Sequence, residues 1–281
     1  MAINKEQVYK GGIYETKASL SSILADLDQI IEIANGVAAR NKQRIKYAGI
    51  TLPVAIVVAV VSAIAGIDWL AVISAVTAIV SLVGLIYFLV QGGKFATPRT
   101  RVQMAKQRVG MLQQDCGTQA PFSLRVGLVP KLVRARGTPA HGGRSDKFFE
   151  DNWFALEGKL LDGTVVSDEI GNLTRQRTRA GRSGKVKTKT RVTYLVNVRF
   201  SYPKETYGDA RATGKAIQGA VKVGPSAVLR DVRVSEKTIV LKAKVSSETD
   251  VMQTAGMLSL GGYRILNLAR RIAARQGGKA Q

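Results

Sequence analysis

The sequence predicts an α+β membrane protein. A two-helix transmembrane hairpin with flanking amphipathic helices would carry a cytoplasmic, antiparallel β-rich domain closed by a C-terminal helix. Three observations predict this fold. Residues 47–93 hold one formal charge, Asp68, in a chain of net charge +22. Residues 121–246 contain several runs of alternating apolar and polar side chains, which is the period of strands. Residues 247–281 form an amphipathic basic helix. The expected segments are an N-terminal amphipathic helix (1–46), the transmembrane helical hairpin (47–93), a post-membrane helix (94–120), the basic β-rich cytoplasmic domain (121–246) and the C-terminal basic helix (247–281).

Two apolar blocks, residues 47–67 and 69–91, make up the predicted hairpin. At ~1.5 Å per residue, each can cross a hydrocarbon core of ~30 Å. Small residues recur along both blocks, and they would let helices approach closely within the chain or between subunits of a homo-oligomer. They are Ala55, Ala59 and Ala63 in the first block, and Ala71, Ala75 and Ala78 in the second.

Basic residues flank the hairpin on both sides, whereas the turn between the blocks has none. Short basic flanks resist translocation, so we expect both termini to be cytoplasmic. The protein would be an integral membrane protein, assigned to the bacterial inner membrane. The flanking residues are Arg40, Lys42, Arg44 and Lys46 before the hairpin, and Lys94, Arg99, Arg101, Lys106 and Arg108 after it.

Amphipathic helices are expected on either side of the hairpin. Residues 17–46 show an apolar stripe at helical spacing that includes Leu20, Leu24 and Leu27. Residues 98–114 show a second stripe, with Val102 and Val109 on one face. The two helices would pack antiparallel within the chain. The alternative is a parallel coiled coil between the first helix and its copy in another subunit.

The region 121–246 predicts five or six antiparallel strands, in a sheet or a small barrel. Residues 153–161 meet residues 164–170 across Asp162-Gly163, a strong signal for a β-hairpin. Further strands are expected near residues 122–128, 192–200, 228–234 and 239–245. The last helix would begin at a capping box, Ser247 to Asp250, and break at Gly261-Gly262. We expect it to cover the open sheet face; the alternative is that it lies on the membrane.

The composition predicts a protein without catalytic, cofactor-binding or metal sites. Cys116 and His141 are the only cysteine and histidine, so the chain offers no disulfide and no zinc cluster. No phosphate-binding loop of Walker type is present. The adjacent carboxylates Glu150 and Asp151 would point to opposite faces of a strand. We therefore expect a non-enzymatic protein.

Residues 174–191 contain eight basic side chains and no acidic one, and they are the candidate site. Their alternation around two glycines favours the two arms of a long β-hairpin. Such a ribbon could bind anionic lipid, and nucleic acid is the alternative, although no aromatic residue lies between Asn172 and Thr193 to stack on bases. A solvated basic loop is the third interpretation. The predicted anion-binding residues are Arg175, Arg177, Arg179, Arg182, Lys185, Lys187, Lys189 and Arg191.

Residues 15–115 are laid out as an amphipathic helix, two membrane spans and a second helix, ahead of a cytoplasmic domain. This layout is similar to that of the two-transmembrane effectors of bacterial nucleotide-signalling defence systems. The resemblance implies oligomers that breach the membrane when a sensor domain is triggered. From the residues themselves, we expect a membrane-anchored protein, an oligomer, whose basic β-domain binds an anionic partner. The alternatives are a pore-forming effector gated by that domain and a membrane-tethered nucleic-acid binder.

Overall fold

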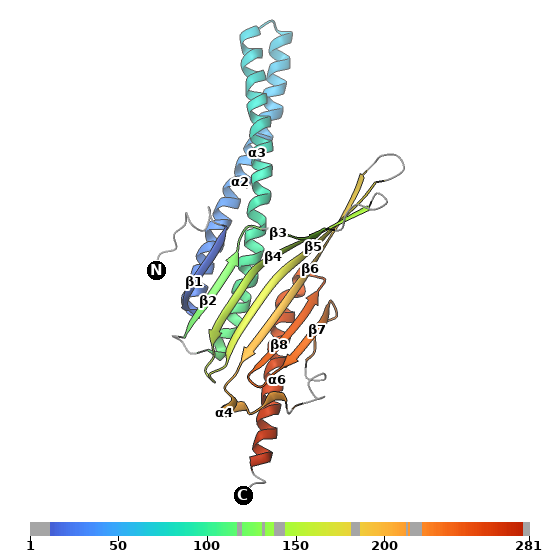
Figure 1. Cartoon of the computed structure of the whole chain (residues 1–281). Coiled ribbons are helices and arrows are strands. Elements are labelled where there is room, and N and C mark those ends of the chain that lie inside the picture. The colour runs from blue at the N-terminus through green and yellow to red at the C-terminus, as the bar shows by residue number, and fades with distance from the viewer. Residues whose placement is uncertain are drawn as a thin grey trace. The chain divides into compact units, whose positions relative to one another are not determined.

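The computed structural model describes residues 12–116, 120–130, 133–137, 144–180, 186–211, 213 and 221–277 (Figure 1). The chain divides into two units. The β unit consists of Met1–Leu27 and Gln103–Gln281, and the hairpin unit consists of Asp28–Val102. The two long helices, α2 (Leu20–Ile64) and α3 (Asp68–Leu112), each contribute to both units.

The hairpin unit contains two helices that are long and apolar enough to cross a membrane. Their most apolar 18-residue windows have mean hydropathies of 2.3 and 2.4, and only 11% and 6% of these windows is buried. A tight turn joins the helices, in which Gly66 has a φ of +71° and the Ile67 amide donates to the Ser62 carbonyl at 2.9 Å. The hairpin therefore presents apolar side chains such as Ile64 and Val80 on its outside.

The seam between the two helices uses hydroxyl residues as well as alanines. Ala55, Ser62 and Ser74 are buried, and the hydroxyls of Thr51 and Ser81 lie 3.1 Å apart. The predicted alanine stripes are only partly in this seam, and near the turn the buried small residues are Ser62 and Ser74. Ala59 and Ala78 are half-buried, Ala63 and Ala75 are exposed, and the side chain of Ala71 lies outside the described residues.

The first amphipathic helix, which the apolar stripe predicts over residues 17–46, begins later and continues further in the structure. Residues Ile13–Ser19 form strand β1, which sequence reasoning missed, and α2 then runs without interruption to Ile64. The first turns of α2 are buried at Leu20, Ile23 and Leu27. The predicted stripe near the end of α3 is likewise buried at Ala105 and Val109.

The β unit is built on one eight-stranded antiparallel sheet of order β1-β2-β4-β5-β6-β8-β7, with β3 paired to β4 off this path. In this order β1 and β7 are the two edges, so the sheet is open and the alternative of a small barrel is wrong. The Asp162-Gly163 hairpin is confirmed as the turn between β4 and β5. The strands after β1 are β2 (Pro121–Gly127), β3 (Val133–Gly137), β4 (Arg144–Lys159), β5 (Val165–Ala180), β6 (Val186–Ser201), β7 (Ala227–Val234) and β8 (Thr238–Val245).

Helix α6 (Val251–Gly277) packs on β6 and β8 and covers one face of the sheet, as predicted, and a short helix α4 (Lys204–Tyr207) contacts α6 (Figure 1). Sequence reasoning expected a kink or a break at Gly261-Gly262, and the break is wrong, because α6 is continuous there. A Cβ at Gly262 would lie 2.3 Å from the Phe200 ring, so this glycine lets the helix approach the sheet closely. The predicted capping box is also absent, since Ser247 makes no side-chain capping bond.

The last turns of α3 enter the core between the sheet and α6. There the Arg108 guanidinium donates to the Asp168 carboxylate at 2.6 Å and also to the Ser259 hydroxyl. The side chains of Arg108 and Asp168 are only 1% exposed. Three elements, α3, β5 and α6, therefore meet at one buried ion pair.

Candidate functional site: a cationic ribbon

Three strands extend the sheet into a ribbon made of residues 144–152 of β4, 172–180 of β5 and 186–193 of β6 (Figure 1). We call this segment the cationic ribbon. The two arms predicted from the basic alternation are its β5 and β6 parts. Sequence reasoning missed the third strand, because residues 144–152 of β4 do not alternate between apolar and polar side chains, and the predicted strand begins at residue 153.

The base of the ribbon is fixed by a β-bulge at Trp153. The bulge shifts the register between Asn152 and Phe154, and the buried Trp153 indole donates to the Asn172 side chain at 3.2 Å. Gly171 makes room for the bulge, since a Cβ there would lie 2.3 Å from the Asn152 side-chain oxygen. Bulges bend and twist a strand, so this one sets the direction in which the ribbon leaves the sheet.

The predicted basic residues form a ladder on one face of the ribbon. Arg175 pairs with Arg191, Arg177 with Lys189, and Arg179 with Lys187, directly across the β5–β6 register. Side chains two residues apart share a face of a strand, and directly opposite Cβ atoms are ~5 Å apart. Like charges in this position repel each other and destabilise the pairing. On β5 and β6 the opposite face carries uncharged side chains, including Thr178 and Thr188, whose hydroxyls are 3.4 Å apart, and Lys147 and Asp151 of β4 share that face.

One carboxylate compensates part of this ladder. Asp146 of β4 accepts from Arg175 at 2.5 Å and from Arg177 at 3.0 Å. The hydrogen bonds from Arg177 and Arg175 lower the pKa of Asp146 to about 2, and the same carboxylate raises the pKa of Arg177. Asp146 was not predicted as a site residue. Asp146 is opposite Arg177 only because the bulge between Asn152 and Phe154 shifts the register by one residue, so extending the predicted hairpin register outward would have placed Asp146 opposite Thr178.

An aromatic ring also lies on the cationic face. Phe148 is opposite Arg175 in the register, and the Arg175 guanidinium carbon lies 5.6 Å from the centre of its ring, within range of a cation–π contact. The basic segment itself, residues 174–191, contains no aromatic residue, and Phe148 comes from the neighbouring strand.

The remaining basic residues lack such a partner. Among the described residues, no ion pair involves Arg179, Lys187, Lys189 or Arg191, and all four are exposed. Arg182 and Lys185, which were also predicted to bind anions, lie outside the described residues, as does His141. The six basic residues of the β5–β6 ladder thus have one carboxylate, Asp146, in the described ion pairs, and Glu150 of β4 lies further along the same face, opposite Leu173.

The cationic face is continuous with the side of the sheet that α6 does not cover. Val166, Asp168 and Ile170 of β5 are buried on the α6 side. Because successive side chains alternate, the odd-numbered residues of β5, which include Arg175, lie on the opposite face. The ladder is therefore accessible along its length.

Possible metal ligands and the single cysteine are the other features relevant to chemistry. Those residues contain no group of three or more His, Cys, Asp or Glu side chains that could hold a metal ion. Cys116 is buried, and burial raises the pKa of its thiol to about 11, which leaves it a poor nucleophile at neutral pH. Comparison with known proteins finds no matching family model, no matching curated protein and no matching solved structure.

Proposed function

We propose that the protein is a membrane-anchored, non-enzymatic binding protein, in which the cationic ribbon docks on an anionic lipid surface. The observation that carries this proposal is the ladder of three like-charged cross-strand pairs, in which Asp146 is the only carboxylate that forms a described ion pair. An anionic partner would relieve the repulsion between these pairs when it binds, which the folded chain alone does not do.

Lipid is favoured over nucleic acid by the rest of the chain. The two apolar helices would hold the β unit beside a bilayer, where each basic residue near an anionic surface contributes ~1 kcal/mol. Phe148 is only half-exposed and is in contact with Arg175, so it is poorly placed to stack on a base. The same chain would also form a homo-oligomer, for which exposed Ala63 and Ala75 offer small-residue contacts between hairpins.

Binding can be measured with the full chain in nanodiscs of neutral phosphatidylcholine, mixed with liposomes at near-physiological salt. We expect binding to liposomes that contain phosphatidylserine, and none to neutral liposomes. Replacing three ribbon cations that do not touch Asp146 should weaken binding about tenfold or more. The variant is Arg179→Gln/Lys187→Gln/Lys189→Gln.

A matched control removes the same number of charges elsewhere. The variant Arg264→Gln/Arg271→Gln/Arg275→Gln changes exposed or half-exposed residues of α6 and should bind anionic liposomes nearly as well as the native chain. An equal loss in both variants would mean that net charge, and not the ribbon, governs binding. Release from liposomes by duplex DNA or RNA in direct competition would make the protein a membrane-tethered nucleic-acid binder.

A second candidate function is a pore gated by the β unit. Its supporting observation is that α3 carries both the second apolar segment and Arg108, which pairs with Asp168 in the core. Expression of a pore former should collapse the membrane potential of the host cell. Ala75→Leu, at an exposed small residue of the hairpin, should abolish that collapse, whereas an anchor would cause no collapse and would tolerate the change.

A further inference from the structure

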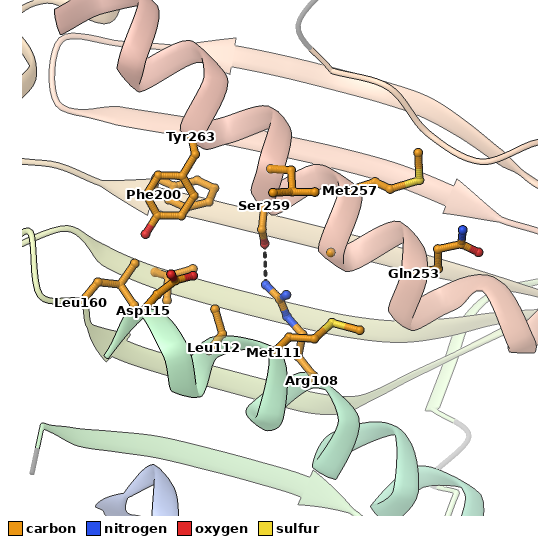
Figure 2. Close-up of a pocket in the computed structure, with 13 residues that line it drawn as sticks. Arg108, Met111, Leu112, Asp115, Leu160, Phe200, Gln253, Met257, Ser259 and Tyr263 are labelled. Carbon is orange, nitrogen blue, oxygen red and sulfur yellow. Dashed lines mark hydrogen bonds between the residues drawn. The ribbon is translucent and has the colours of Figure 1, made fainter. Parts of the chain in front are cut away.

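A second site, unrelated to the ribbon, lies inside the β unit. A cavity of about 370 Å³ opens between the end of α3, the sheet and α6 (Figure 2). This volume falls within the range of small-molecule sites, which is roughly 300–1,000 Å³. Its walls are largely apolar and include Leu112 and Met111 of α3, Phe200 of β6, and Met257 and Leu260 of α6.

The cavity is elongated along α6. Tyr263 lines one end and Gln253 the other, ten residues apart on the same helix, which corresponds to ~15 Å at ~1.5 Å per residue. Figure 2 shows Asp115 and Leu160 at the Tyr263 end. Polar groups thus lie at the two ends of an apolar slot, a shape that suits a chain with a small polar head.

Gly256 provides independent support for a ligand in this slot. Glycine is unfavourable inside a helix, and in α6 two of the three interior glycines have a packing reason: Gly262 makes room for Phe200, and Gly261 for Val221. At Gly256, the nearest described atom to an added Cβ is the Met111 sulfur at 3.6 Å, an ordinary contact. Packing therefore does not require this glycine, but a side chain there would project into the slot.

The charges at the slot indicate the kind of head group. Arg108 lines the slot, but its charge is already matched by Asp168, and the Ser259 hydroxyl is also bonded to it. Asp115, at the Tyr263 end, is exposed and has no ion pair among the described residues. Burial raises the pKa of the Tyr263 hydroxyl, so it stays a neutral hydrogen-bonding group. A carboxylate head would be repelled by Asp115, whereas an uncharged hydroxyl head could bond to Asp115 and Tyr263.

We propose that the slot between α3 and α6 binds a single-chain lipid with an uncharged, hydroxyl-bearing head, of which a monoacylglycerol is the simplest example. The site uses no residue of the ribbon, so its test is independent of the lipid-surface binding proposed above. The apolar helices of the chain matter to this site only because they would bring the protein close to membrane lipid.

The test uses a diazirine-bearing analogue of 1-lauroylglycerol with the full chain in nanodiscs, followed by mapping of the cross-linked peptides. We expect cross-links in residues 105–116 and 251–263 that unlabelled 1-lauroylglycerol competes away. Gly256→Leu should reduce them about tenfold or more, because its side chain overfills the slot. Cross-links confined to residues 47–93, or undiminished by Gly256→Leu, would overturn the proposal.

Two controls keep the result interpretable. Gly110→Leu makes the same change in α3 at a site that does not line the slot and has no described atom within 4 Å of its Cβ, so its cross-linking should match the native chain. The melting temperature of Gly256→Leu should equal or exceed that of the native chain, since helix propensity rises. A melting temperature well below the native one would show that Gly256 has a packing role and would remove the main support for the site.

Competition by unlabelled laurate tests the head group. Laurate has the same chain but an anionic head, and it should compete about tenfold or more weakly, because its charge would lie near Asp115. Asp115→Asn should remove this difference. Equal competition by the two lipids against the native chain would overturn the assignment of an uncharged head.

Discussion

Asp146 is the residue that decides how much of the ribbon's charge is available to a partner. Its carboxylate pairs with Arg175 and Arg177, two of the six basic residues of the β5–β6 ladder. We expect Asp146→Asn to tighten binding to anionic liposomes about fivefold, because it frees charge equivalent to at least one basic residue. Co-sedimentation of the native and variant chains with liposomes at one salt concentration measures this. Weaker binding by the variant would mean that Asp146 mainly holds the ribbon in its binding shape.

The same carboxylate predicts a dependence of stability on pH. The folded-state pKa of Asp146 is about 2, below its ordinary value of 3.8. A lowered pKa gives stability that is fully present above the unfolded value and is lost as the pH falls through the folded value. The melting temperature of the native chain should therefore exceed that of Asp146→Asn at pH 5, and the difference should shrink below pH 3.8 and vanish below about pH 2. The buried Trp153 provides a fluorescence signal for unfolding.

The buried pair of Arg108 and Asp168 makes a prediction about stability. One Asp168 oxygen already has no hydrogen-bond partner among the described residues. Arg108→Met leaves the whole carboxylate unpaired in the core and should cost about 3–5 kcal/mol in the free energy of unfolding.

The double variant Arg108→Met/Asp168→Leu separates the lost pair from the lost packing. It should recover most of the stability that Arg108→Met loses, because an apolar pair replaces a buried charge. Denaturant unfolding of the native chain and the three variants, including Asp168→Leu, measures the coupling. Additive losses in the double variant would contradict the assignment of the cost to an unpaired charge.

At the scale of elements, the position of α6 over the sheet depends on Gly262. Because the Phe200 ring occupies the place of a Cβ, Gly262→Ala forces the helix or the ring to move and should cost about 1–3 kcal/mol. Gly256→Ala is the matched change six residues earlier in α6, and it should be neutral or stabilising. Thermal unfolding of the two variants tests the pair of expectations, and equal effects would contradict them.

The sequence predicts those elements whose signal lies within a few consecutive residues. The β4–β5 turn at Asp162-Gly163 and strands β7 and β8 follow from turn chemistry and from alternation within a few residues. Strand β1 was missed because Ile13–Ser19 is short and leads directly into a helical stripe that begins at Leu20. Its strand character depends on pairing with β2, more than 100 residues later, which no local pattern shows.

The candidate site was predictable only along a single chain segment. The basic alternation of residues 174–191 indicated the arms and their cationic face. Asp146 forms an ion pair with Arg175, and the Phe148 ring lies next to the Arg175 guanidinium. Both residues come from the outer half of β4, in which apolar and polar side chains do not alternate. The slot under α6 was not predicted, because a cavity is set by how Met111, Gly256 and Phe200 fit together after folding.

For the whole molecule, the distribution of charge predicts which way the hairpin crosses a bilayer. The chain outside residues 47–93 holds all 42 basic side chains, and the turn around Gly66 holds none. Since the Lys and Arg excess stays cytoplasmic, the turn should be on the far side and the ribbon on the near side. Single cysteines at Ile67 and Thr188, in a Cys116→Ser background, report these two positions.

A membrane-impermeant maleimide applied to intact spheroplasts should label Ile67→Cys at once and Thr188→Cys only after permeabilisation. Both positions are exposed, so burial within the chain does not block either. Labelling of both from the same side would show that the hairpin does not cross. The apolar surface of α2 and α3 would then have to be covered by protein, because water cannot solvate so many exposed Val and Ile side chains. In that case the subunits of an oligomer, and not the bilayer, would cover the apolar helices. The mass of the protein in solution would show whether such an oligomer forms.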